Sequence, residues 1–268
     1  MRTRKIWQRL FVYRLLWYIT NYKANINKTG DNKDKVPAMK LMKTKITDII
    51  KETSDTYSYR MEVPQGMTWK AGQHVLFKME GFELDPEDRD TRVFSISSAP
   101  EDGFLQFTTR IGELHTSFKE VLLNKIKVGD PISVAEPLGV LDFHQEKGKS
   151  LVIAGGIGVT PVRSLLKHYS EDNIPQHQIT VLYSDERGEF AYGNFWEETK
   201  AKMDNLDLHL LDNRDTFTNM VKDYATANGN DAEYLIVGSP GMNAAFTETL
   251  EGLGVEKENI FTDDFIGY

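Results

Sequence analysis

The sequence predicts two domains in succession, an antiparallel six-stranded β-barrel followed by a parallel α/β sheet. The chain has 268 residues, and about 150 are typical of one domain. Short β-type runs separated by turn residues come first, and strands then alternate with helical patterns at a near-constant spacing. We therefore expect an extension and linker over residues 1–37, the barrel over residues 38–146 and the α/β domain over residues 147–268.

The N-terminal segment differs from the rest of the chain in charge. Residues 1–45 contain 12 basic and two acidic side chains, so they carry +10, and the remaining residues carry −18 of the net charge of −8. The apolar run from Ile6 to Ile19 contains two arginines and is shorter than the ~20 residues of a transmembrane helix. Residues 1–23 are expected to contact an anionic membrane surface or an acidic partner, or else to pack on the barrel. The acidic body is expected to repel nucleic acid, and the expected location is the cytoplasm, either free or peripheral at the inner membrane surface.

The chain contains no cysteine. This excludes disulfides, thiolate nucleophiles, zinc fingers and cysteine-ligated iron–sulfur clusters. Its six histidines are scattered, without the spacing of metal ligands. We expect no metal site, so that any redox chemistry would need an organic cofactor.

Six β-type runs predict the barrel. Turn residues separate them, among them Pro64-Gln65-Gly66 and the acidic stretch from Glu83 to Asp90. One helix is expected to begin at Ser117, because Ser117 and Glu120 have the spacing of a capping box. The predicted strands are Lys43–Ile50, Tyr57–Val63, His74–Lys78, Arg92–Ser98, Phe104–Arg110 and Pro131–Ala135.

Four buried-looking strands predict the α/β domain. They begin near Leu151, Ile179, Asp207 and Tyr234, at separations of 28, 28 and 27 residues. Each interval can hold a crossover helix with its turns, so a parallel sheet with helices on both faces is expected.

A glycine-rich junction, from Ala154 to Pro161, follows the first of these strands. Gly156 and Gly158 permit tight turns and the close approach of a ligand, while Thr160 can cap the next helix and Pro161 suits its first position. The helix N-terminus would then face an anion such as a dinucleotide pyrophosphate. The alternative is a connection selected only for packing.

A second strand-to-helix junction, from Val237 to Met242, repeats this arrangement. Ligands of open α/β sheets bind outside the carboxyl ends of the strands. The two junctions are therefore expected to border one crevice.

The stretch from Arg92 to Ser98 combines a cation, an aromatic ring and hydroxyl groups. Arg92 and Phe94 share one face of a strand, where they could hold a phosphate and stack on a flat ring. An ordinary strand with a core phenylalanine and a surface ion pair is the alternative.

In this order, the motifs resemble the ferredoxin-NADP reductase superfamily over residues 41–268. Arg92-Val93-Phe94-Ser95 is similar to its RxYS flavin motif. The resemblance implies that Arg92 meets the flavin phosphate, that Phe94 stacks on the isoalloxazine ring and that Ser95 approaches flavin N5. The segment from Gly112 to Ser117, with Thr116, is similar to the segment that supplies backbone amides and a hydroxyl to the pyrophosphate.

The resemblance extends to the nucleotide loops and the C-terminal tail. It makes Gly155 to Pro161 the nicotinamide dinucleotide loop, and the last eight residues are similar to an acidic and aromatic tail near the flavin. Phe94 replaces the usual Tyr, Val237 stands where many relatives have Cys, and Asp263 stands where many have Glu. The implied cofactor-binding residues in these parts are Gly155, Gly156, Gly158, Thr160, Pro161, Gly238, Pro240, Met242 and Tyr268, and the implied catalytic residues are Ser95, Asp263 and Phe265.

The implied function is hydride transfer from NAD(P)H to FAD, followed by electron delivery to a separate acceptor such as ferredoxin, flavodoxin or another carrier. FAD is favoured over FMN because both pyrophosphate segments are present. Ser184 and Arg187 could hold the 2'-phosphate of NADPH, whereas Asp185 or Glu186 could bind the ribose hydroxyls of NADH, and the pattern slightly favours NADPH. Two alternatives stay open: a membrane-tethered flavin reductase that serves an integral oxidase or desaturase, and a non-catalytic flavin or nucleotide sensor.

Overall fold

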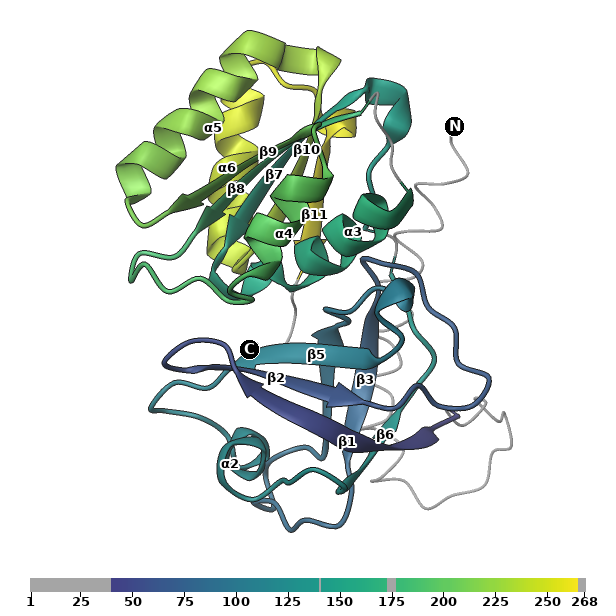
Figure 1. The fold of residues 1–268 in the computed structure, drawn as a ribbon. Helices are drawn as coiled ribbons and strands as arrows, with labels where there is room; N and C mark the ends of the chain where they lie inside the picture. The colour runs from purple at the N-terminus through teal and green to yellow at the C-terminus, as the bar shows by residue number, and fades with distance from the viewer. Residues whose placement is uncertain (1–39, 140, 173–176, 265–268) are drawn as a thin grey trace, which may run out of the picture. The chain divides into compact units, whose positions relative to one another are not determined.

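The computed structural model describes residues 40–139, 141–172 and 177–264, which Figure 1 shows as a coloured ribbon. The predictions made for the N-terminal extension, residues 1–37, lie outside the described residues. Those made for the last four residues of the chain do so too.

Residues 42–134 form the predicted six-stranded antiparallel barrel, in the order β4-β3-β6-β1-β2-β5. A bridge between Ile96 and Phe107 joins the two edge strands, and the Ser97 amide donates to the Gln106 carbonyl at 2.8 Å. The bounds are β1 Met42–Lys51, β2 Thr56–Met61, β3 His74–Met79, β4 Thr91–Ser95, β5 Leu105–Arg110 and β6 Pro131–Val134, with helix α2 Ser117–Asn124 and the short 3-10 helix η1 Pro100–Asp102.

The second sheet is parallel and has the order β11-β10-β7-β8-β9. Four strands are those expected from the sequence, and the fifth is not, because residues 260–264 are interpreted from the sequence only as part of a tail. An edge strand has one neighbour, so a short run with two acidic residues can pair on one side without a buried signature. The bounds are β7 Lys149–Gly155, β8 Gln178–Ser184, β9 Leu206–Leu211, β10 Glu233–Gly238 and β11 Ile260–Asp264.

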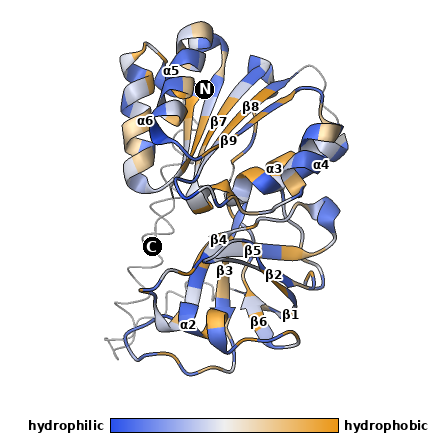
Figure 2. Cartoon of the chain, turned by 60° about the vertical axis from the view of Figure 1, so that its left-hand side comes forward, coloured by the Kyte–Doolittle hydropathy of each residue, from blue (hydrophilic) through white to orange (hydrophobic). Residues whose placement is uncertain are grey.

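Helices cover both faces of the parallel sheet (Figure 1). Val152 and Ala154 of β7 belong to the core cluster under α3 and α4, whereas Leu151 and Ile153 belong to the cluster under α5 and α6. This alternation explains why β7 and β8 are hydrophobic along their length in Figure 2. The bounds are α3 Val159–Asp172, α4 Phe195–Lys202, α5 Arg214–Asn228 and α6 Pro240–Gly252, with 3-10 helices η2 Gln145–Lys147, η3 Gly156–Gly158, η4 Gly229–Asp231 and η5 Lys257–Asn259.

Two helix starts differ from the prediction. The N-cap of α2 is Thr116, whose hydroxyl accepts from the Lys119 amide, and Ser117 is the first helical residue. Helix α3 begins at Val159, directly after η3, so Thr160 and Pro161 lie within its first turn and not at its cap. The glycines before Val159 already form a helical turn, which moves the start of the helix toward the strand.

A buried arginine connects α3 with the barrel. Arg163 is 7% exposed, and its guanidinium donates to Asp102 Oδ2 at 2.7 Å and to the Ser97 carbonyl at 2.8 Å. Its Cζ also lies 4.8 Å from the centroid of the Phe195 ring. Next to it, Ser164 donates to the Ser98 carbonyl at 2.8 Å. These contacts attach the first turns of α3 to the chain between β4 and β5.

We expect Arg163→Ala to lower the free energy of unfolding by about 3–5 kcal/mol, because it leaves the Asp102 carboxylate buried without its cation. Urea denaturation measures this change. Lys167→Ala is the matched control on the same helix, since the Lys167–Glu171 pair is exposed, and it should cost only about 0.2–1 kcal/mol. Equal costs for the two variants would contradict the assignment.

Candidate functional site

The two glycine junctions lie side by side at the carboxyl ends of β7 and β10. The chain builds the sheet from β7 outward to β9 and then returns to β10 on the other side of β7. This reversal is a topological switch point, where open α/β sheets bind ligands. A Cβ on Gly155 would lie 2.3 Å from Met242 Sδ, so the first junction touches the second. The predicted adjacency of the two loops is confirmed.

The glycines of the first junction have different reasons to be glycine. A Cβ on Gly158 would lie 2.2 Å from the Val237 carbonyl oxygen, so Gly158 is required for packing against β10. Gly156 has φ +51° and no atom within 4 Å of a built Cβ. Gly156 is therefore the position that leaves space beside the backbone, and the helical turn η3 that contains it contacts β5 of the barrel.

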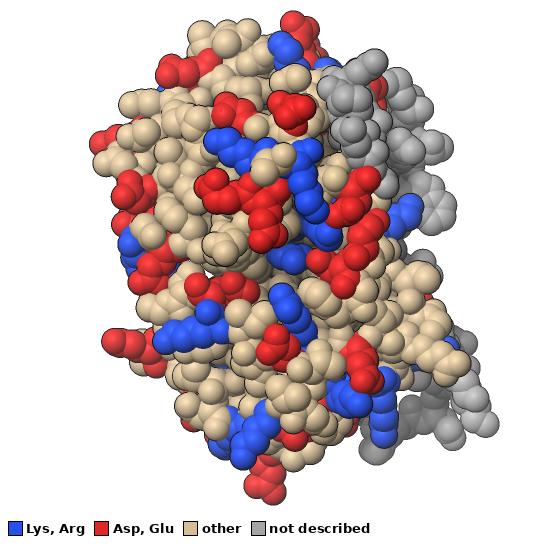
Figure 3. All heavy atoms as spheres, viewed as in Figure 1, with Lys and Arg blue, Asp and Glu red and all other residues tan. Residues whose placement is uncertain are grey.

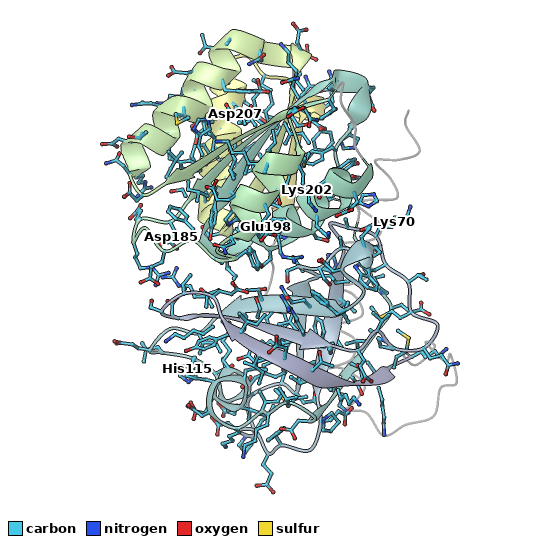
Figure 4. All side chains as sticks on the ribbon, in the orientation of Figure 1. Lys70, His115, Asp185, Glu198, Lys202 and Asp207 are labelled. Atoms are coloured by element: carbon cyan, nitrogen blue, oxygen red, sulfur yellow. The ribbon has the colours of Figure 1, made fainter. Side chains whose placement is uncertain are left out.

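Arg187, the predicted 2'-phosphate ligand, is surrounded by carboxylates. Its guanidinium lies 3.2 Å from Asp185 Oδ1, 2.9 Å from Asp55 Oδ2 and 3.9 Å from Glu189 Oε2. Asp185 is buried and follows β8 directly; Figure 4 labels it. Ser184, the other predicted ligand, is the last residue of β8.

These charges do not add up to a phosphate site. Arg110 Nε also donates to Asp55 at 2.8 Å. Burial raises the pKa of Asp55, but Arg110 and Arg187 outweigh burial and lower it below its usual value. Two guanidinium groups thus face three carboxylates, for a local charge of −1. Acidic and basic side chains are interleaved over the whole face in Figure 3.

Strand β4 positions the three residues of the flavin motif. Phe94 is half-buried, and its ring stacks on Phe107 of the barrel with the centroids 4.6 Å apart and the planes 5° apart. Ser95 is 4% exposed. Its hydroxyl oxygen is buried and has no hydrogen-bond partner within the described residues. A buried hydroxyl without a partner costs free energy, so it indicates a ligand atom that completes the site.

Arg92 contacts a carboxylate that sequence reasoning does not assign to the site. Its guanidinium donates to Asp88 Oδ1 and to the carbonyls of Arg89 and Thr91. Ser117 Oγ and the Phe118 amide both donate to Asp88 Oδ2 at 2.8 Å. The i,i+4 spacing of Asp88 and Arg92 is the signal that could have found this residue, but the acidic stretch is interpreted from the sequence only as a loop.

The remaining predicted residues divide between the loops and the C-terminal tail. The Gly112 carbonyl lies 2.7 Å from His115 Nδ1; Figure 4 labels His115 beside α2. Asp263 lies in β11, where its carbonyl accepts from Asn243 at 3.0 Å. Phe265 and Tyr268 lie outside the described residues. Pro240 is the first residue of α6, whose N-cap is Ser239.

Metal ligands and membrane-spanning helices are both missing from the described ranges. These ranges contain no group of three or more potential metal ligands. No helix within them has the length and apolar character needed to cross a membrane.

Comparisons with known proteins place these features in a family context. Residues 152–248 match the oxidoreductase NAD-binding domain family. Ferredoxin-NADP+ reductase from Plasmodium falciparum superposes with a TM-score of 0.71 at 17% identity, covering 84% of this chain and 96% of that one. The flavohem-like FAD/NAD binding domain of nitric oxide dioxygenase from Vibrio cholerae gives 0.66 at 18% identity, covering 84% and 98%. The chain has the ferredoxin-NADP reductase fold. The predicted fold class and the predicted resemblance are both confirmed.

A curated relative belongs to the Na(+)-translocating NADH-quinone reductase of Mannheimia succiniciproducens, as its F component. It is 28% identical over 199 residues, which cover 66% of this chain and 49% of that protein. This chain therefore spans about half the length of the curated relatives it matches.

The two glycines of the first junction should respond differently to alanine. Gly158→Ala forces a methyl group against the Val237 carbonyl, so we expect a loss of about 2–3 kcal/mol in unfolding free energy. Gly156→Ala should cost only about 1–2 kcal/mol, from its left-handed backbone, but should weaken NADH binding more strongly. Denaturation curves and NADH titrations of both variants measure this. A Gly158→Ala protein as stable as wild type would contradict the packing role.

Proposed function

We propose that this protein is an FAD-dependent oxidoreductase that passes electrons from NADH through the flavin to a separate acceptor. The observation that carries the proposal is the Ser95 hydroxyl, which is buried without a partner in the described structure and follows Arg92 on the same short strand. The match of residues 152–248 to the oxidoreductase NAD-binding domain family supports the nucleotide half of the proposal.

Residues on β4 and at the start of α2 would hold the flavin. Arg92 and Ser117 would bind its phosphate, Phe94 would contact the ring, and Ser95 would donate its hydroxyl to the ring edge. When bound, the flavin would supply the acceptor for a hydride from the nicotinamide and release electrons onward. Gly156 and the loop at Gly238 to Met242 would position the nicotinamide dinucleotide, because both lie at the switch point of the sheet.

NADH is the proposed coenzyme. The sequence slightly favours NADPH through Ser184 and Arg187, but Asp55, Asp185 and Glu189 surround Arg187. A 2'-phosphate would enter a region whose net charge is already negative, and like charges at this distance repel. The neutral ribose hydroxyls of NADH meet no such repulsion.

The acceptor is proposed to be a partner protein or a quinone-type small molecule at a membrane. The relatives named as components of an NADH-quinone reductase support this choice. The basic and aromatic residues within 1–23 would then contact an anionic membrane surface or the acceptor complex.

An anaerobic spectrum tests the proposed reaction. We expect NADH to bleach the flavin band of the FAD-loaded protein, at least about tenfold more efficiently than NADPH, a difference of about 1.4 kcal/mol. Glu189→Gln should narrow this preference because it removes one carboxylate beside Arg187. Glu186→Gln, an exposed residue of the same turn, is the control.

Three outcomes would contradict parts of this proposal. A protein that does not bind added FAD refutes the flavin site. A flavin band that NADH leaves unchanged indicates a sensor. Faster reduction by NADPH than by NADH refutes the coenzyme assignment.

The N-terminal segment should be dispensable for flavin chemistry. A chain that starts at Met39 is expected to bind FAD and to oxidise NADH with a small artificial acceptor, but to lose sedimentation with anionic vesicles. Each basic residue near such a surface contributes about 1 kcal/mol to binding. Insoluble or flavin-free truncated protein would show that the segment belongs to the folded core.

A further inference from the structure

An acidic loop, residues 83–90, lies over the start of α2 and inserts one carboxylate there. The Asp88 side chain is 11% exposed, and the side chain of its partner Arg92 is 17% exposed. Six of the eight loop residues are exposed, and only Leu84 and Asp88 are half-buried. The loop therefore contributes little to the core, and Asp88 is its main polar contact with the barrel.

The Asp88 carboxylate is surrounded by hydrogen-bond donors. Oδ2 accepts from Ser117 Oγ and from the Phe118 amide, each at 2.8 Å. Oδ1 accepts from the Arg92 guanidinium and, at 2.8 Å, from the Arg89 amide. Ser117 Oγ also accepts from the Asp85 amide at 3.0 Å, so the loop uses both functions of this hydroxyl.

These interactions favour the ionised carboxylate. Burial raises the pKa of Asp88, but the hydrogen bonds from the Phe118 amide, Arg92 and Ser117 outweigh burial and hold the pKa well below its usual value. The group is thus an anion at neutral pH, placed at a helix N-terminus and paired with an arginine. This is also the environment that a phosphate group requires.

We propose that Asp88 is an affinity-determining residue of the flavin site: its carboxylate occupies the phosphate donors of the cofactor-free protein and leaves them when FAD binds. The inference rests on the proposed function, because Arg92 and Ser117 are the residues assigned there to the flavin phosphate. One guanidinium fork, one hydroxyl and one amide cannot serve a carboxylate and a phosphate at the same positions. Two anions there would also repel each other.

The exchange lowers the apparent affinity for FAD. When a binding-competent state is only fractionally populated, the apparent dissociation constant rises by the inverse of that fraction. Asp88 has four donors in the described structure, so the open state is the minor one. Because the loop is mostly exposed, moving it disrupts few packing contacts, and the exchange depends on the carboxylate itself.

The test compares FAD affinities of cofactor-free proteins by flavin fluorescence and calorimetry. Asp88→Ala and Asp88→Asn should bind FAD about tenfold or more tightly than wild type, because the competing anion is gone. Asp90→Asn removes the same charge from the same loop, but Asp90 is exposed and lies 3.8 Å from Lys78. This control should change the FAD affinity by less than about twofold, since exposed charges are screened by salt. Asp88 variants that bind FAD equally well or more weakly would overturn the proposal.

A second probe separates this inference from the proposed function. Inorganic pyrophosphate should raise the melting temperature of Asp88→Ala more than that of wild type, and Arg92→Ala in the same background should abolish the difference. If no variant binds FAD but pyrophosphate still distinguishes them, the proposed function fails and the role of Asp88 stands. If pyrophosphate stabilises wild type and Asp88→Ala equally, the role of Asp88 is refuted.

Discussion

The buried pair of Arg163 and Asp102 determines how the nucleotide end of the α/β domain meets the barrel. Arg163 lies in the first turns of α3, directly after the glycine turn, and its guanidinium also donates to the Ser97 carbonyl beyond β4. The strand that carries Arg92 and Ser95 and the turn that contains Gly156 are thereby attached to the same side chain. A buried ion pair contributes little net stability compared with apolar packing, so its value lies in fixing one geometry.

Arginine is used in three ways in this chain, and burial and partners distinguish them. Arg163 is buried with one carboxylate and acts in structure. Arg187 is neutralised by several carboxylates, which favours a coenzyme without a 2'-phosphate. Arg92 has a single carboxylate partner among the described residues, Asp88, on a mostly exposed loop. The same guanidinium group is therefore structural, excluding or exchangeable according to what surrounds it.

Much of the fold follows from local sequence patterns. The six barrel strands and four of the five parallel strands lie where alternation and buried runs predict them, within a few residues at their ends. Strand β11 escapes prediction because an edge strand with Thr262 and Asp263 lacks an apolar signature. The starts of α2 and α3 differ from the prediction by one or two positions, because cap residues are adjacent in sequence and only backbone geometry selects among them.

The sequence by itself determined the order of the motifs, and with it the fold, because strand and helix periodicity and glycine spacing are local properties of the chain. It also identified Ser95 and Gly156, whose roles follow from their own backbone positions. The tertiary structure alone decided which charges meet. Asp55 lies more than a hundred residues before Arg187, and Asp102 lies 61 residues before Arg163. Whether an arginine is available to a phosphate depends on such distant carboxylates, and no local pattern records them.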